Sequence, residues 1–178
     1  DTDVVLTTRE LARMIKAAGI DFSNLEDEPA DRLLGSYTGA GTIFGVTGGV
    51  MEAALRTAYC LITGEAQPPS IEFSEVRGMD GIKTATIDIK GTKVNIAVAH
   101  QMGNVEKVIN QIREDRRNGV RPRYDFIEVM ACRGGCVAGA GTILPVDKAA
   151  KLVDKYSREA AAASPTESAY CGRGESLD

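Results

Sequence analysis

Apolar residues recur along the chain at two spacings, which predict helices and strands in alternation. Residues 4–20 predict a short strand and then a helix, with Leu11, Met14 and Ile15 on its buried face and Gly19 at its end. Three further segments repeat apolar residues every third or fourth position, as helices with one buried face do: residues 50–63, 104–119 and 145–163.

Strand-like segments lie between these helices. Alternating, β-branched sequence is found in residues 71–78, 82–91, 92–101 and 124–131, with Gly91 at a hairpin turn. Strands that alternate with helices long enough for a crossover indicate an α/β fold, layered, with a mostly parallel sheet flanked by helices. The polar residues 21–42 predict a long loop that is functional or covered by a partner. We expect one domain over residues 1–163 and a flexible tail over residues 164–178.

Composition narrows the possible functions. The chain has 178 residues, enough for a substantial core, and its 43% hydrophobic and 26% charged content argues against disorder. A net charge of −4 offers no basic surface for nucleic acid. No apolar run approaches the roughly 18 residues of a membrane span and no signal-peptide pattern opens the chain, so we expect a cytoplasmic protein. With His100 as the single histidine, a His-rich metal site is excluded.

The four cysteines differ in their surroundings. Cys60 lies in an apolar helical segment, where a buried, inert thiol is expected, and Cys171 lies in the polar tail. Cys132 and Cys136 lie in the loop ACRGGCVAGAG after a predicted strand. Such thiols can ligate zinc or an iron–sulfur cluster, because glycines let the backbone approach an inorganic centre. A redox dithiol and a purely structural loop are the alternatives. The dithiol is disfavoured because thioredoxin-type motifs have two intervening residues, not three.

A second glycine motif, Thr47-Gly48-Gly49, precedes the helix that begins near Val50. Its N–H groups and the helix dipole predict a site facing an anion, such as phosphate or a metal-bound anion. Neither a Walker lysine nor GxGxxG spacing accompanies it. We expect this turn and the cysteine loop both to follow strands. They would then converge at the carboxyl edge of one sheet, where α/β proteins bind ligands.

Two segments, IFGVTGGVMEAALRTAY and FIEVMACRGGCVAGAG, resemble the catalytic domain of iron-only (FeFe) hydrogenases. DTDVVLTTRELARMIKAAGIDFSNL is similar to the stretch after that family's second cysteine motif, so the likeness runs from about residue 1 to about residue 145. The resemblance implies the C-terminal lobe of the H-cluster domain, in a short-tailed variant. The implied cofactor is the H-cluster, a [4Fe–4S] cubane linked to a diiron subsite with CO, cyanide and dithiolate ligands. The implied activity is reversible H2 oxidation and proton reduction.

The resemblance also implies roles for individual residues. Cys132 and Cys136 would ligate the cubane, and Cys136 would also bridge to the diiron subsite. Met130 would pack against that subsite and, with Cys136, form the catalytic part of the site. The cofactor-binding wall would comprise Phe44, Thr47, Gly48, Gly49 and Val50.

The resemblance leaves parts of the family's site outside this sequence. Its other two cubane cysteines, its proton-donating cysteine and the lysine that holds a cyanide have no counterpart here. We therefore expect a hetero-oligomer or fragment in which an N-terminal lobe or separate chain carries those cysteines, with an electron-carrier protein or iron–sulfur subunit as a further partner. Arg133 stands where the family usually has Pro, and GAGTILP replaces the usual GGGQP. The alternative is a hydrogenase-like H2 sensor or an iron–sulfur assembly protein with little turnover.

Overall fold

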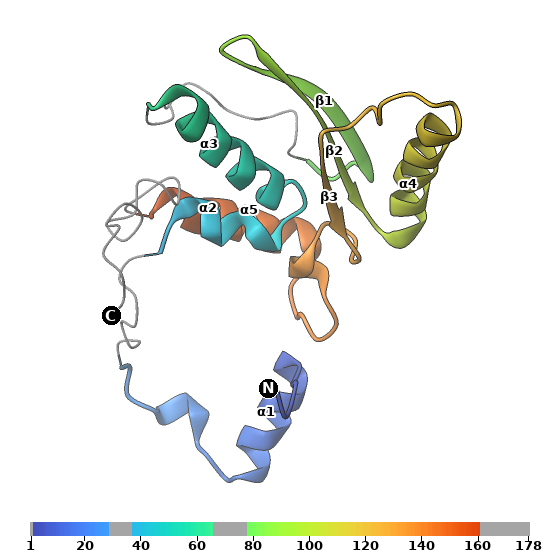
Figure 1. Cartoon of the computed structure of the whole chain (residues 1–178). Coiled ribbons are helices and arrows are strands. Elements are labelled where there is room, and N and C mark those ends of the chain that lie inside the picture. The colour runs from blue at the N-terminus through green and yellow to red at the C-terminus, as the bar shows by residue number, and fades with distance from the viewer. Residues whose placement is uncertain (1, 29–36, 66–77, 161–178) are drawn as a thin grey trace.

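A three-stranded sheet with helices on both faces organises the computed structural model, which describes residues 2–28, 37–65 and 78–160 (Figure 1). β1 (Ile82–Ile89) and β2 (Thr92–His100) form an antiparallel hairpin with Gly91 at its turn, and β3 (Phe126–Met130) pairs in parallel with β2. The layered α/β fold is confirmed. Among the described strands the sheet is mixed rather than mostly parallel, because a tight turn joins β1 to β2 and only the β2-to-β3 connection contains a helix.

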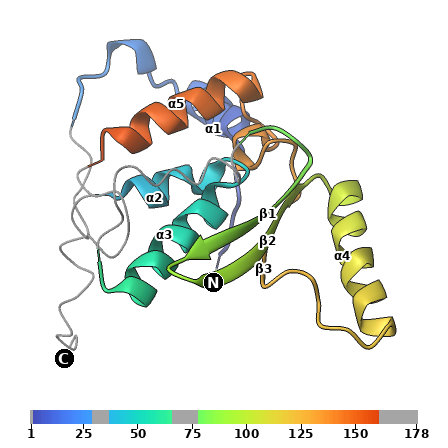
Figure 2. The same ribbon diagram turned by 90° about the horizontal axis from the view of Figure 1, so that it is seen from above.

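Helices α3 (Gly49–Thr63) and α4 (Met102–Arg117) cover opposite faces of this sheet (Figure 2). Successive residues of a strand point to opposite faces, so β2 supplies both halves of the core. Ile96 and Val98 pack with α3, while Ala97 and Ala99 pack with α4. Both helices lie where the apolar spacing predicted them, since each buries one side against the sheet.

A second layer of helices lies on the α3 side. α2 (Gly39–Thr42) packs on α5 (Val146–Arg158), where the ring of Tyr37 stacks on that of Tyr156 with centroids 4.6 Å apart. Between α2 and α3, residues 43–45 form a short 3-10 helix, η2 (Ile43–Gly45). The prediction of a strand before the Thr47 turn is therefore wrong. Thr38 caps α2, and the helical backbone continues into η2 instead of extending.

The N-terminal part of the chain contributes nothing to this core. α1 (Thr8–Ala17) begins at a capping box between Thr7 and Glu10 and is followed by the short 3-10 helix η1 (Phe22–Asn24), and no residue of either is buried. The predicted strand over residues 4–6 does not form. Leu11 is 48% exposed and Met14 is 54% exposed, so the predicted buried face of α1 is not buried. Nothing within the described residues covers it.

Some sequence predictions fall outside the described residues. These are most of the strand over residues 71–78, the end of the last helix beyond residue 160, and the tail over residues 164–178 with Cys171. Where the structure does describe helices, none combines the length and the apolar character that a membrane span needs.

Candidate functional site

The cysteine loop begins where β3 ends, and it keeps its backbone buried while its thiols remain accessible. Cys132 is half-buried and Cys136 is exposed, and neither is in a disulfide. Gly135, between them, has a φ of 102° and is buried. A Cβ at this position would lie 2.7 Å from both the Gly45 carbonyl oxygen and the Thr47 nitrogen. Only glycine fits there, because both the backbone conformation and the space exclude a side chain.

The loop meets the Thr47-Gly48-Gly49 turn, as the sequence predicted. The Thr47 N–H donates to the Gly134 carbonyl at 2.9 Å. Gly49 lies so close to η2 that a Cβ on it would be 1.7 Å from the Ile43 carbonyl oxygen. Two motifs far apart in the sequence are thus in direct backbone contact.

Glu128 of β3 caps the N-terminus of α3, a role that the sequence analysis missed. This residue is 4% exposed; its Oε1 accepts the Gly48 N–H at 2.6 Å and its Oε2 accepts the Met51 N–H at 2.8 Å. A carboxylate is favourable here because it satisfies N–H groups that the helix leaves unpaired and interacts with the positive end of its dipole. The expectation that these N–H groups face an external anion is corrected, since the protein supplies its own. An acidic residue inside an apolar strand was the available signal.

Thr47 and Met130 lie beneath the loop. Met130 is buried, and its Sδ would be 2.9 Å from a Cβ on Gly135, so it packs against the loop backbone. Thr47 is completely buried, and its Oγ1 has no hydrogen-bond partner among the described residues. A buried hydroxyl without a hydrogen bond lowers the stability of the fold. A polar group outside the described residues is therefore expected as its partner.

The structure brings the predicted site residues together on three adjoining segments. Phe44 is exposed on η2, and Val50 is partly buried in the first turn of α3 beside the buried Gly48 and Gly49. Cys60 lies near the other end of α3, apart from the loop. It is partly exposed rather than buried as predicted, because this side of the helix faces away from the sheet.

These residues fit one side of an iron–sulfur cluster. A cubane takes four thiolates, and the loop supplies two from a glycine-rich backbone that permits close approach. Within the described residues no group of three or more His, Cys, Asp or Glu side chains is arranged to hold a metal ion. Among the described residues the loop therefore supplies two thiolates, half the number that a cubane takes.

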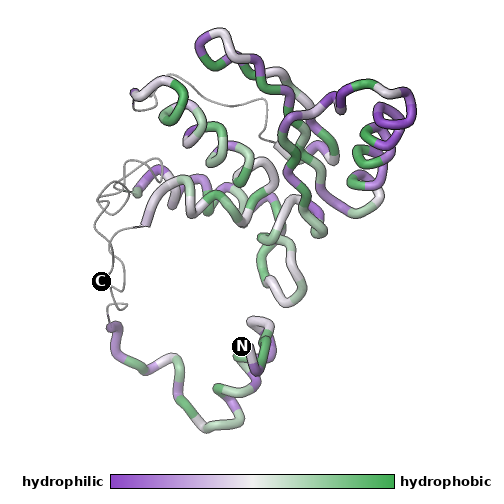
Figure 3. The backbone as a smooth tube through the Cα atoms, in the orientation of Figure 1, coloured by the Kyte–Doolittle hydropathy of each residue, from purple (hydrophilic) through white to green (hydrophobic). Residues whose placement is uncertain are grey.

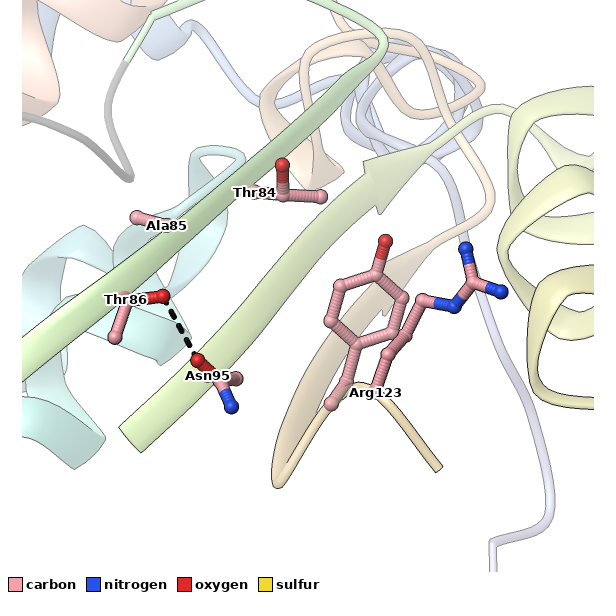
Figure 4. Close-up of a pocket in the computed structure, with 6 residues that line it drawn as sticks. Thr84, Ala85, Thr86, Asn95 and Arg123 are labelled. Atoms are coloured by element: carbon pink, nitrogen blue, oxygen red, sulfur yellow. Dashed lines mark hydrogen bonds between the residues drawn. The ribbon is translucent and has the colours of Figure 1, made fainter. Parts of the chain in front are cut away.

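A polar depression of about 350 Å³ lies near the other end of the strands (Figure 4). Asn95 in its lining precedes His100 by five residues, about 17 Å along β2. Arg123 in its lining forms hydrogen bonds and an ion pair with Asp115, which lowers the pKa of Asp115 and raises the pKa of Arg123. The Tyr124 hydroxyl likewise donates a hydrogen bond to Gln111. Because Arg123 and Tyr124 already have partners within the chain, the depression does not indicate a particular ligand.

Sequence comparison identifies relatives of the chain. The family described as "Iron only hydrogenase large subunit, C-terminal domain" matches residues 1–140. The chain is 56% identical over 141 residues to the periplasmic [Fe] hydrogenase large subunit of Nitratidesulfovibrio vulgaris, covering 79% of this chain and 32% of that protein. It is 50% identical over 141 residues to iron hydrogenase 1 of Clostridium pasteurianum, covering 79% and 24% respectively. Protein NAR1 of Arabidopsis thaliana is 32% identical over 149 residues, covering 82% and 30%.

Solved structures agree with these relatives. A variant of [FeFe]-hydrogenase HydA1 from Chlamydomonas reinhardtii superposes with a TM-score of 0.55 at 37% identity, covering 87% of this chain and 44% of that one. The chain thus spans about a third or less of the curated relatives and less than half of the solved hydrogenase. The matched sequence includes both the cysteine loop and the Thr47-Gly48-Gly49 turn. The chain therefore belongs to the family of the iron-only hydrogenase large subunit, C-terminal domain.

Proposed function

We propose that this chain is one half of an iron-only hydrogenase catalytic domain, which catalyses reversible H2 oxidation and proton reduction once a second half completes the H-cluster. The observation that carries the proposal is the convergence of the Cys132–Cys136 loop with the Thr47 turn. It is supported by 56% identity to a hydrogenase large subunit over the part of the chain that contains both motifs.

The residues of this chain bind and enclose the cofactor in this proposal. Cys132 and Cys136 would hold one side of the cubane, and Cys136 would also link it to the diiron subsite. Met130 would pack beside that subsite, and the buried Thr47 hydroxyl would donate a hydrogen bond to a cofactor ligand. Phe44 and Val50 exclude water from the same cavity. When bound, the H-cluster would supply the iron site and would carry the electrons that proton reduction consumes and H2 oxidation releases, exchanging them with the electron-carrier partner.

The second half covers the apolar side chains that this chain leaves exposed. Figure 3 shows the hydropathy along the backbone, with apolar residues spread through the N-terminal segment. Apolar side chains are well exposed all along residues 2–28, among them Val4, Val5, Leu11, Met14 and Phe22. Exposed apolar surface of this extent is typical of an interaction site. We assign it to the lobe or chain that carries the remaining cubane cysteines, with an electron-carrier protein or iron–sulfur subunit as a further partner. The cytoplasmic location stays a prediction, and one relative is named as periplasmic.

Two cysteine substitutions test the proposal on the complex matured with the family's accessory enzymes. Cys136→Ser removes the bridging thiolate, so we expect the infrared bands of metal-bound CO and cyanide to disappear and the iron content to fall. Cys60→Ala lies away from the loop and controls for the loss of a thiol, so its bands and iron content are expected to match those of the wild type. Normal CO bands in the Cys136→Ser protein would contradict the assignment.

The alternative is a hydrogenase-like sensor or an iron–sulfur assembly protein. Similarity to Protein NAR1, and to the cytosolic Fe–S cluster assembly factor narfl of Xenopus tropicalis at 28% identity, favours it. Arg133, in place of the usual Pro, also departs from the hydrogenase pattern. A matured complex with a cubane spectrum but without CO and cyanide bands would support the assembly protein. Intact bands with little H2 turnover would support the sensor.

A further inference from the structure

His100 lies directly behind the cysteine loop, and the proposed cluster site does not use it. It is the last residue of β2, pairs in register with Met130, and is 2% exposed. Both ring nitrogens have partners. Nε2 lies 3.2 Å from the Met79 carbonyl oxygen, and Nδ1 lies 3.2 Å from the Gly134 nitrogen.

These two partners select one form of the imidazole ring. The Met79 carbonyl can only accept, so Nε2 carries the proton and donates it. The Gly134 N–H can only donate, so Nδ1 offers a lone pair. A neutral ring with its proton on Nε2 satisfies both contacts at once.

Gly134, midway between the two cysteines, is held on both sides. Its N–H donates to His100 and its carbonyl accepts from the Thr47 N–H, so the loop is tied both to β2 and to the entry of α3. It is also closely packed, because a Cβ at this position would lie 2.5 Å from Val146 Cγ1 and 3.2 Å from the Met79 Sδ. The N–H of the peptide group between Arg133 and Gly134 is buried. This peptide group therefore keeps its orientation only while His100 accepts that N–H.

We propose that His100 is a positioning residue for the cysteine loop. By accepting the Gly134 N–H, it sets the direction in which Cys132 and Cys136 are presented before any cluster arrives. A ligand pair fixed in advance loses less conformational entropy on binding, so it retains a cluster more tightly. The inference rests on the proposed function, because it takes the two thiols as cluster ligands. The ordering of the loop by His100 depends only on the observed hydrogen bonds.

Two substitutions separate the two contacts of the ring. The side-chain amide of Asn overlays the Nδ1 edge of histidine, so His100→Asn keeps an acceptor for the Gly134 N–H. The amide of Gln reaches the Nε2 position, so His100→Gln keeps the contact with Met79 and loses the one with Gly134. Tyr124→Phe serves as the control, since it removes one hydrogen bond, to Gln111, away from the loop.

The first measurement is hydrogen exchange of the Gly134 amide by NMR, on the iron-free full chain. We expect exchange in His100→Gln to be faster than in the wild type by about 10-fold or more, with α4 amides unchanged, and near-wild-type exchange in His100→Asn. The second measurement is [4Fe–4S] retention against a chelator, in the complex with the cysteine-bearing half. We expect a loss of about 10- to 100-fold in His100→Gln, rescue in His100→Asn, and no loss in Tyr124→Phe.

Unchanged Gly134 exchange in His100→Gln, or equal damage in His100→Asn and His100→Gln, would overturn the inference. A wild-type complex that takes up no cluster would instead refute the proposed function, and the exchange measurement would still decide the role of His100.

Discussion

Changing Glu128 to Gln removes the charge that caps α3 and nearly preserves the shape of the side chain. In the wild type, the carboxylate accepts N–H groups from Gly48 at 2.6 Å and Met51 at 2.8 Å. Gln has one carbonyl oxygen, so one of these N–H groups would face an amide NH2 instead of an acceptor.

The expected loss of stability follows from these contacts. A hydrogen bond to a charged group contributes about 1.5–3 kcal/mol and a neutral one about 1 kcal/mol. Gln therefore weakens one bond and leaves the other N–H buried without an acceptor, which by itself costs about 1–3 kcal/mol. Because Glu128 is only 4% exposed, water cannot substitute for the missing acceptor. We expect the free energy of unfolding to fall by about 3 kcal/mol.

Urea denaturation of the full chain, followed by far-UV circular dichroism, measures this change. Glu106→Gln is the matched control, because Glu106 is exposed on α4 and its replacement should change stability by less than about 0.5 kcal/mol. Glu128→Asp should also be destabilising, since the shorter side chain cannot reach both N–H groups. The capping argument is refuted if Glu128→Gln loses no more stability than Glu106→Gln.

Three further substitutions probe the surroundings of the site and the stability of the sheet. Gly135→Ala should cost about 1–3 kcal/mol more in the same assay than Gly91→Ala, because both have positive φ but only Gly135 is closely packed; equal losses would argue against close packing. Hydrogen bonds from Arg123 lower the pKa of Asp115, so the stabilisation by this carboxylate is present above its ordinary pKa and lost as the pH falls through the folded-state value. Asp115→Asn should therefore be destabilised at pH 7, and its difference from the wild type should shrink as the pH falls below the ordinary Asp range; a pH-independent difference would contradict this. Thr47→Val should leave the thermal stability of the iron-free chain unchanged or raise it by about 1 kcal/mol, while reducing iron retention; clear destabilisation would mean that the hydroxyl has a partner within the chain.

The sequence predicted those parts of the fold that depend on local patterns. α3 and α4 were predictable because the apolar face of each is buried against the sheet, and the hairpin was predictable from Gly91 between two alternating segments. The exposure of α1 was not predictable, because periodicity shows which face is apolar but not whether anything covers it. The helical form of η2 was missed because a short apolar run does not distinguish a strand from a helical turn.

In the candidate site, too, some residues were predictable from local patterns and others were not. Cys132 and Cys136 were predictable because the chain has few cysteines, and the Thr47 turn was predictable because paired glycines before a helix indicate a close approach of the backbone. Glu128 and His100 were missed because each acts on backbone groups far away in the sequence. A helix cap is usually expected just before its helix, whereas here it comes from a neighbouring strand. Only the pairing of β2 with β3 brings these side chains to the site.

The uncovered N-terminal segment has a consequence for how the cell handles this polypeptide. Residues 2–28 place their apolar side chains in water with no buried position among them. Chaperones and proteases recognise such segments on unassembled subunits, so copies made in excess would be removed within the cell. In the proposed assembly, abundance would then follow the supply of the other half. Where the second half is a separate chain, synthesis of the two halves would have to be balanced.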